Sequence, residues 1–154
     1  MFKENDITKE LLSGIVPEGW TDIFELTSFK EKHNEFDIAL EERADLVPDA
    51  IKNKDWVLNG YCKALELMDF PLRGKPVYIK IKRRRWKIRG EGRSYANPHD
   101  LNYPGVKATK EFADFLKGLD REALDEFLDA WPVYRRMWEK DTSLVQRFLK
   151  RFQR

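Results

Sequence analysis

The order of hydrophobic and polar residues along the first half of the chain predicts two β-hairpins. Phe36, Ile38 and Leu40 fall on one side of an extended segment, and acidic residues occupy its other side. The segment 23–29 shows a similar period of two, and the polar residues 31–34 between the segments suit a turn. Alternation of this kind is typical of a hairpin with one face exposed to water.

The second predicted hairpin consists of segments 63–70 and 77–82, and residues 71–74 contain the proline and glycine of a short turn. Continued alternation beyond the return strand would bury Arg83 and Arg85, which is too costly for unpaired charges. We therefore expect either a β-bulge near residue 82 that switches faces or a strand end that projects beyond the sheet. In both cases these arginines reach solvent or a ligand.

Apolar residues at helical spacing predict helices elsewhere in the chain. The expected helices cover residues 6–15, 109–118, 120–131, 132–140 and 142–152. Asp6, Thr109 and Asp120 are the expected N-caps, and Pro132 suits a first helical turn. Two segments lack a clear period, and we expect a loop with some helix over 44–60 and a loop over 90–105.

Strands that precede helices indicate the α+β class. We expect a small antiparallel sheet of two β-hairpins, followed by a C-terminal cluster of three to four helices. Residues 1–105 would form the β-rich region with the basic hairpin, and residues 106–154 the helical region. A chain of 154 residues with 42% hydrophobic residues can bury a core, so both regions are expected to pack as one globular unit.

Several classes of function lack their usual sequence signals. The chain has no glycine-rich phosphate loop, no Gly-x-Ser-x-Gly elbow and a single cysteine, Cys62, so we expect neither an enzyme nor a cysteine-built zinc site. His33 and His99 are isolated and are interpreted as surface residues rather than metal ligands. We expect no cofactor, no membrane span and a cytoplasmic, nucleoid-associated protein.

Positive charge is concentrated in one stretch of a nearly neutral chain. Residues 73–93 contain ten basic residues and one acidic residue, whereas residues 1–72 contain 16 acidic and eight basic residues. Like charges this close repel one another, and a polyanionic partner relieves that repulsion. The candidate nucleic-acid-binding residues are Lys80, Lys82, Arg83, Arg84, Arg85, Trp86, Lys87 and Arg89, and a secondary basic surface consists of Arg147, Lys150 and Arg151.

In this interpretation the cations neutralise phosphates of duplex DNA, and the hairpin enters the major groove as a β-ribbon. Trp86 would stack on a base or sugar, although packing is the commoner fate of tryptophan. The residues leave two alternatives: a protein-interaction module whose cationic stripe docks an acidic partner or a second copy, and an RNA-binding protein. A solvated strand face is the plain alternative, but such a face usually mixes signs, whereas seven of the ten residues from 80 to 89 are basic and none is acidic.

The segment 69–86, with the sequence DFPLRGKPVYIKIKRRRW, resembles the amino-terminal region of bacterial insertion-sequence transposases of the ISAon type. The segments 17–25 and 109–116 resemble the same family in the same order. The resemblance implies a non-catalytic DNA-binding protein of a mobile genetic element, which binds transposon ends beside a separately encoded catalytic subunit. After Leu116 the chain departs from the family, which continues toward a helix-turn-helix. Helices 109–118 and 120–131 could pack as that motif, but the second would present Asp125, Glu126 and Asp129, which phosphates repel, so the arginines of the strand are the expected DNA contacts.

Overall fold

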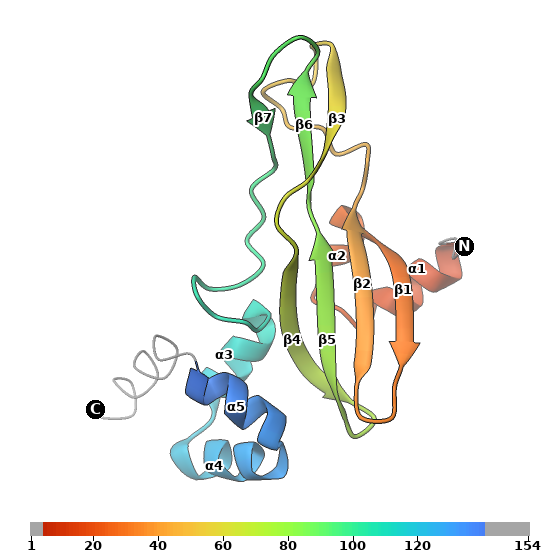
Figure 1. Cartoon of the computed structure of the whole chain (residues 1–154). Coiled ribbons are helices and arrows are strands. Elements are labelled where there is room, and N and C mark those ends of the chain that lie inside the picture. The colour runs from red at the N-terminus through yellow and green to blue at the C-terminus, as the bar shows by residue number, and fades with distance from the viewer. Residues whose placement is uncertain (1–4, 141–154) are drawn as a thin grey trace.

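A computed structural model describes residues 5–140 and has an α+β fold with two β-sheets (Figure 1). The helices are α1 (Asp6–Ser13), α2 (Trp20–Ile23), α3 (Lys110–Gly118), α4 (Arg121–Ala130) and α5 (Pro132–Lys140). The strands are β1 (Phe24–Glu31), β2 (Phe36–Glu42), β3 (Trp56–Tyr61), β4 (Leu65–Leu72), β5 (Lys75–Lys82), β6 (Arg84–Ile88) and β7 (Ser94–Tyr95). The predicted helix 142–152 lies outside the described residues.

The larger sheet has the strand order β1-β2-β5-β4 and contains both predicted hairpins. The expectation of an antiparallel sheet is wrong in one place, because β2 and β5 pair in parallel. Parallel neighbours need a long crossover connection. Here the connection from β2 passes through β3 and β4 before the chain returns as β5, so one strand of the second sheet, β3, is inserted between two neighbours of the first.

The turn of the β4–β5 hairpin differs in detail from the prediction. Arg73 and Gly74 are its central residues, with φ angles of 50° and 78°, as a type I′ turn requires. Pro71 lies in β4 instead, where the register is irregular between Asp69 and Leu72. Proline is tolerated at such a place because it has no N–H to donate to a ladder.

The smaller sheet has the order β3-β6-β7 and rises above the larger one (Figure 1). We call it the arm, and define it as residues 56–62 and 83–95. The expectation of loops over 44–60 and 90–105 is therefore wrong where β3 and β7 form. Strand β3 is held by pairing with β6, a neighbour distant in sequence that local periodicity does not reveal. Strand β7 pairs with the nearby β6 through only two residues, which are too few to show a period.

Strand β5 continues into β6 through Arg83, and the buried side of the chain changes there. Ile79 and Ile81 are fully buried before the break, and Trp86 is fully buried after it. Odd-numbered residues thus face the core in β5 and even-numbered ones in β6. The predicted change of faces near residue 82 is confirmed, and it lets the strand leave one sheet and join another.

Two hydrophobic clusters flank strand β4. Leu67 belongs to the first, which α1 and α2 cover with Leu12 and Trp20. Met68 belongs to the second, which α3, α4 and α5 supply. Adjacent residues of a strand point to opposite sides, so β4 carries a core on each side.

Helix starts mostly match their predicted caps. Thr109 and Asp120 accept hydrogen bonds from the backbone N–H groups of Phe112 and Ala123, as N-caps do. Pro132 opens α5 as predicted. The prediction for Asp6 is wrong, because Asn5 caps α1 and Asp6 is its first helical residue. Within the described residues, no helix is long and apolar enough to cross a membrane.

Candidate nucleic-acid interface

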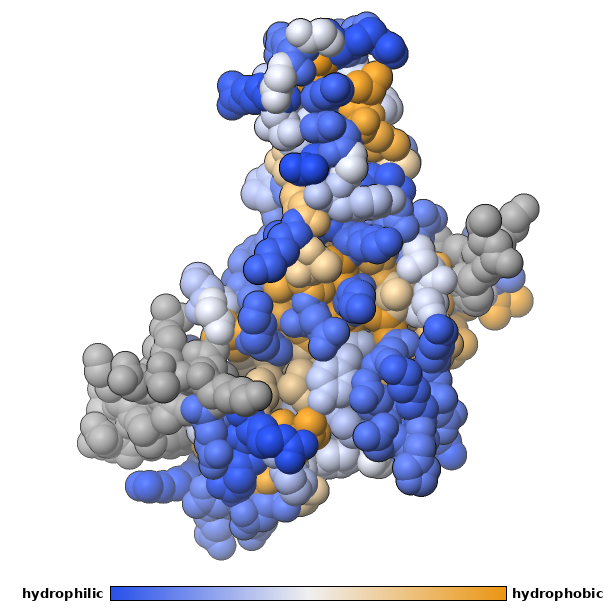
Figure 2. All heavy atoms as spheres, viewed as in Figure 1, coloured by the Kyte–Doolittle hydropathy of each residue, from blue (hydrophilic) through white to orange (hydrophobic). Residues whose placement is uncertain are grey.

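The arm has two chemically different faces. The ladder places Trp86 between Leu58 and Tyr95, so these three side chains share one face. Lys87 lies between Val57 and Ser94 on the other face, which by alternation also carries Arg85. In Figure 2 hydrophilic side chains cover most of the arm, and hydrophobic ones gather along one edge.

Arg85 and Lys87 form no ion pair with any carboxylate in the part of the chain that the structure describes. Arg85 is exposed, and its guanidinium lies over Gly60, where a Cβ would stand 3.6 Å from Nη2. Arg89 contacts Asp55 at 3.1 Å, but both side chains are about 70% exposed. Such a pair is weak and screened by salt, so it leaves Arg89 available to a stronger anion.

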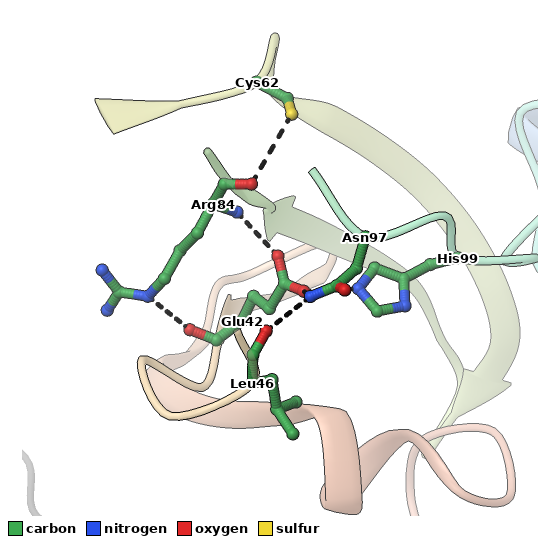
Figure 3. Close-up of polar contacts among 6 residues, drawn as sticks. All are labelled: Glu42, Leu46, Cys62, Arg84, Asn97 and His99. Atoms are coloured by element: carbon green, nitrogen blue, oxygen red, sulfur yellow. Dashed lines mark hydrogen bonds and ion pairs between the residues drawn. The ribbon is translucent and has the colours of Figure 1, made fainter. Parts of the chain in front are cut away.

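Arg84 is held inside the protein, which corrects the expectation that all three arginines are available (Figure 3). Its Nε donates to the backbone oxygen of Glu42 at 2.7 Å, and its Nη2 contacts Oε1 of Glu41 at the same distance. The side chain is only 13% exposed. Arg84 therefore connects the base of the arm to strand β2 of the larger sheet.

Glu42 is the centre of this junction (Figure 3). Its fully buried carboxylate accepts hydrogen bonds from the N–H of Arg84 at 2.7 Å, Nδ2 of Asn97 at 3.0 Å and Nε2 of His99 at 2.6 Å. Burial acts to raise the pKa of Glu42, but the hydrogen bonds from His99, Asn97 and Arg84 outweigh it and lower the pKa. The charged form is therefore the stable one at neutral pH.

This junction was missed by sequence reasoning, which placed His99 at the surface. Its side chain is 10% exposed and packs edge-on against Phe24 as well as contacting Glu42. The sequence did contain one indication of this junction. Like Phe36, Ile38 and Leu40, Glu42 is an even-numbered residue, so the alternation that predicts the hydrophobic face of the strand also places the Glu42 carboxylate on that face.

Arg83 lies in the gap between β5 and β6 and is partly buried. Its Nη2 donates to the backbone oxygen of Lys63 at 3.1 Å. Its Nε is buried without a hydrogen-bond partner among the described residues. Arg83 thus supports the strand crossing, and only part of its guanidinium can reach a ligand.

Lys80 and Lys82 belong to the larger sheet, where acidic residues surround them. In the strand register Lys80 lies beside Glu66, and Lys82 lies beside Glu41. The open face near Lys80 is a hollow of about 500 Å³ whose charged lining has mixed sign: Lys30, Lys32, Lys80, Glu35, Asp37 and Glu66. For this part of the run the plain interpretation, a solvated sheet face, describes the geometry best.

The expectation that Trp86 stacks on a base is corrected by its burial. Its side chain has no exposed surface, and its indole N–H has no hydrogen-bond partner among the described residues. A fully buried tryptophan contributes several kcal/mol to folding. Trp86 is therefore a structural residue of the arm.

The remaining candidates add no second site. Arg147, Lys150 and Arg151 lie outside the described residues. Cys62 is partly buried, with its thiol 3.9 Å from the backbone oxygen of Arg84. Within residues 5–140, no group of three or more histidine, cysteine, aspartate or glutamate side chains could hold a metal ion.

No protein-family model, curated protein or solved structure matches this chain. Among the described residues, Arg85, Lys87 and Arg89 form a cationic face on a sheet that projects from the body of the protein (Figure 1).

Proposed function

We propose that this chain is a non-catalytic DNA-binding protein that contacts duplex DNA through the cationic face of the arm. The observation that carries the proposal is the exposed Arg85, which lies beside Lys87 and Arg89 on a projecting β-ribbon. A ribbon of this kind fits the major groove, where arginine can contact guanine edges and flanking cations can contact phosphates.

The placement of aromatic residues favours a duplex over a single strand. Proteins that bind single strands stack bases on exposed aromatic rings. Here Trp86 is buried, and Tyr95 lies on the same face of the arm with the guanidinium of Arg93 over its ring. The face with Arg85 and Lys87 carries Val57 and Ser94 as their neighbours, so it offers charge without a stacking platform.

Positive charge also dominates the arm, as the binding of a polyanion requires. It contains Arg83, Arg84, Arg85, Lys87, Arg89 and Arg93 against a single acidic residue, Glu91. Each phosphate that a cation neutralises releases condensed counterions, so binding weakens as salt rises. Together with the resemblance to transposase amino-terminal regions, this supports a role in binding the ends of a mobile element beside a separately encoded catalytic subunit.

The test is a salt series of duplex-DNA affinities for the wild type and two triple variants with the same change in charge. The arm variant carries Arg85→Glu, Lys87→Glu and Arg89→Glu. The control variant carries Lys30→Glu, Lys32→Glu and Lys80→Glu on the open face of the larger sheet. For the wild type we expect a log–log slope of about −3 to −4.5, as about three to five phosphate contacts by the cations of the arm would give.

The arm variant should lose about a hundredfold or more in affinity and about three units of slope, whereas the control variant should lose only a few-fold. An equal loss in both variants would mean that overall charge, rather than the arm, determines binding. Competition by single-stranded RNA that exceeds competition by duplex DNA would favour the RNA-binding alternative. Absence of any shift, together with salt-sensitive dimers in light scattering, would favour the protein-interaction module.

A further inference from the structure

A second possible site lies at the end of the molecule away from the arm. Residues 69–74 form the far end of the β4–β5 hairpin, and the proposed DNA interface leaves them without a role (Figure 1). A cavity of about 320 Å³ opens beside them, which is within the range of small-ligand sites. It is lined by Gly14, Ile15, Val16, Asp69, Phe70, Pro71, Leu72, Val77 and Glu111.

The walls of this cavity are apolar, and its two ionisable groups are both acidic. Val16 and Val77 are buried, while Phe70 is 37% exposed and packs edge-on against Phe112 and Phe115. Asp69 and Glu111 supply the carboxylates. A cavity with apolar walls and two carboxylates favours a ligand that combines a positive charge with a hydrocarbon stem.

Asp69 is fixed in place by the surrounding fold. It is 3% exposed, and Oδ1 accepts a hydrogen bond from Oγ1 of Thr109 at 2.7 Å. The backbone oxygen of Asp69 accepts a bond from the hydroxyl of Tyr134, also at 2.7 Å. Burial raises the pKa of Asp69 to about 6, and the nearby charge of Glu111 adds to the increase.

Both carboxylates accept hydrogen bonds from the protein, but neither has a cationic partner within residues 5–140. Oε1 of Glu111 accepts a hydrogen bond from the backbone N–H of Glu18 at 3.1 Å, which fixes Glu111 at the rim. In the described part of the chain neither Asp69 nor Glu111 forms an ion pair. A carboxylate offers about four acceptor positions, so both groups keep capacity for a cationic donor.

We propose that this cavity binds a guanidinium or alkylammonium group, with its charge between Asp69 and Glu111 and its stem against the apolar wall. The planar guanidinium, with five N–H donors, can bond two carboxylates at once. Two sources share this chemistry: a free alkyl cation, and an arginine or lysine side chain presented by a partner protein.

The test uses butylguanidinium and its neutral counterpart of the same shape, butylurea, titrated into the full chain and followed by amide chemical shifts. We expect butylguanidinium to shift the amides of Ile15, Phe70 and Leu72 in a saturable way, and butylurea to leave them unchanged. Equal shifts with both compounds, or none with either, would overturn the proposal.

Two matched variants locate the site. Glu111→Gln retains an acceptor for the N–H of Glu18 but removes one charge, and should weaken butylguanidinium binding about tenfold, as loss of a charge-assisted hydrogen bond would. Glu126→Gln makes the same change at an exposed position of α4 and should have no effect. Equal affinities in the two variants would contradict the site.

The source is distinguished by an acetylated Gly-Arg-Gly peptide with an amidated end. Tighter binding of the peptide than of butylguanidinium indicates an arginine of a partner chain, and weaker binding indicates a free cation. The result is independent of DNA binding, because the cavity lies beside the end of the β4–β5 hairpin that points away from the arm (Figure 1), and the Glu111→Gln variant should bind DNA like the wild type.

Discussion

The larger sheet and the arm share one continuous path of chain, β5 and β6, but they place its basic residues in different surroundings. The four strands of the larger sheet contain four basic and seven acidic residues, so Lys80 and Lys82 have acidic neighbours. The arm contains six basic residues and one acidic residue. The basic residues of one run are therefore balanced by acidic neighbours in the larger sheet and lack such neighbours over most of the arm. The charges on neighbouring strands determine the local electrostatic potential.

The junction between the two sheets should be the most sensitive point of the molecule. Glu42→Ala leaves the N–H of Arg84, the amide of Asn97 and the ring of His99 without their shared acceptor. We expect a loss of about 3–5 kcal/mol in the free energy of unfolding, measured by urea denaturation. Glu66→Ala, at an exposed position of β4, should change it by less than about 0.5 kcal/mol. Similar losses in the two variants would show that the buried junction has no special role.

Arg84 and Arg85 are adjacent in the sequence, but we expect the first to contribute to stability and the second to DNA binding. Arg84→Ala removes contacts to Glu41 and Glu42, and should reduce the free energy of unfolding by about 2–3 kcal/mol. Arg85→Ala removes an exposed side chain, and should change it by less than about 0.5 kcal/mol while weakening duplex-DNA affinity several-fold. Urea denaturation and DNA titration of both variants check this contrast. A destabilised Arg85→Ala variant with unchanged DNA affinity would contradict it.

Two buried carboxyl groups should respond to pH in opposite ways. The pKa of Asp69 is raised to about 6, so the folded state binds this proton more tightly than the unfolded state. Its protonation adds about 1–2 kcal/mol of stability between pH 7 and pH 5, and this gain is lost as the pH rises through 6. The pKa of Glu42 is lowered, so its contribution is present above about pH 4.5 and lost below.

Urea denaturation at pH 5 and pH 7 measures the contribution of Asp69 before Glu42 begins to titrate. Asp69→Asn should abolish the difference in stability between the two pH values that this group causes. Asp125→Asn, at an exposed position of α4, should leave that difference as in the wild type. A persistent difference in the Asp69→Asn variant would assign the pH dependence to another group.

The smallest expected effect concerns the bulge in strand β3, within the arm. Gly60 has a φ angle of 74°, and the β3–β6 register is irregular between Leu58 and Tyr61. Gly60→Ala should reduce the free energy of unfolding by about 1 kcal/mol, because a side chain is strained in this conformation. Gly118→Ala at the end of α3, where φ is not positive, should be neutral or slightly stabilising by the same urea assay. Equal effects would show that the bulge tolerates side chains.

Local patterns in the sequence determined much of the fold. Both hairpins, the caps at Thr109 and Asp120, the start of α5 at Pro132 and the change of faces near residue 82 follow from periodicity, turn residues and the cost of burying charge. These signals act over a few residues, which is why they can be identified without knowing what packs against them. The alternating pattern also placed Glu42 on the buried face of its strand, but it did not reveal which residues donate hydrogen bonds to Glu42.

Only the tertiary structure decided which basic residues are open to a ligand. Local sequence cannot distinguish Arg84, which Glu41 and Glu42 hold, from Arg85, which stays exposed, because the carboxylates come from a strand more than forty residues away. The parallel pairing of β2 with β5, the formation of β3 and the burial of Trp86 also depend on partners distant in the sequence. Strand β7 pairs with the nearby β6, but it is too short to show a period. The physical reason is common to all of them: a charge or an aromatic ring acquires its role from the neighbours that the folded chain brings to it.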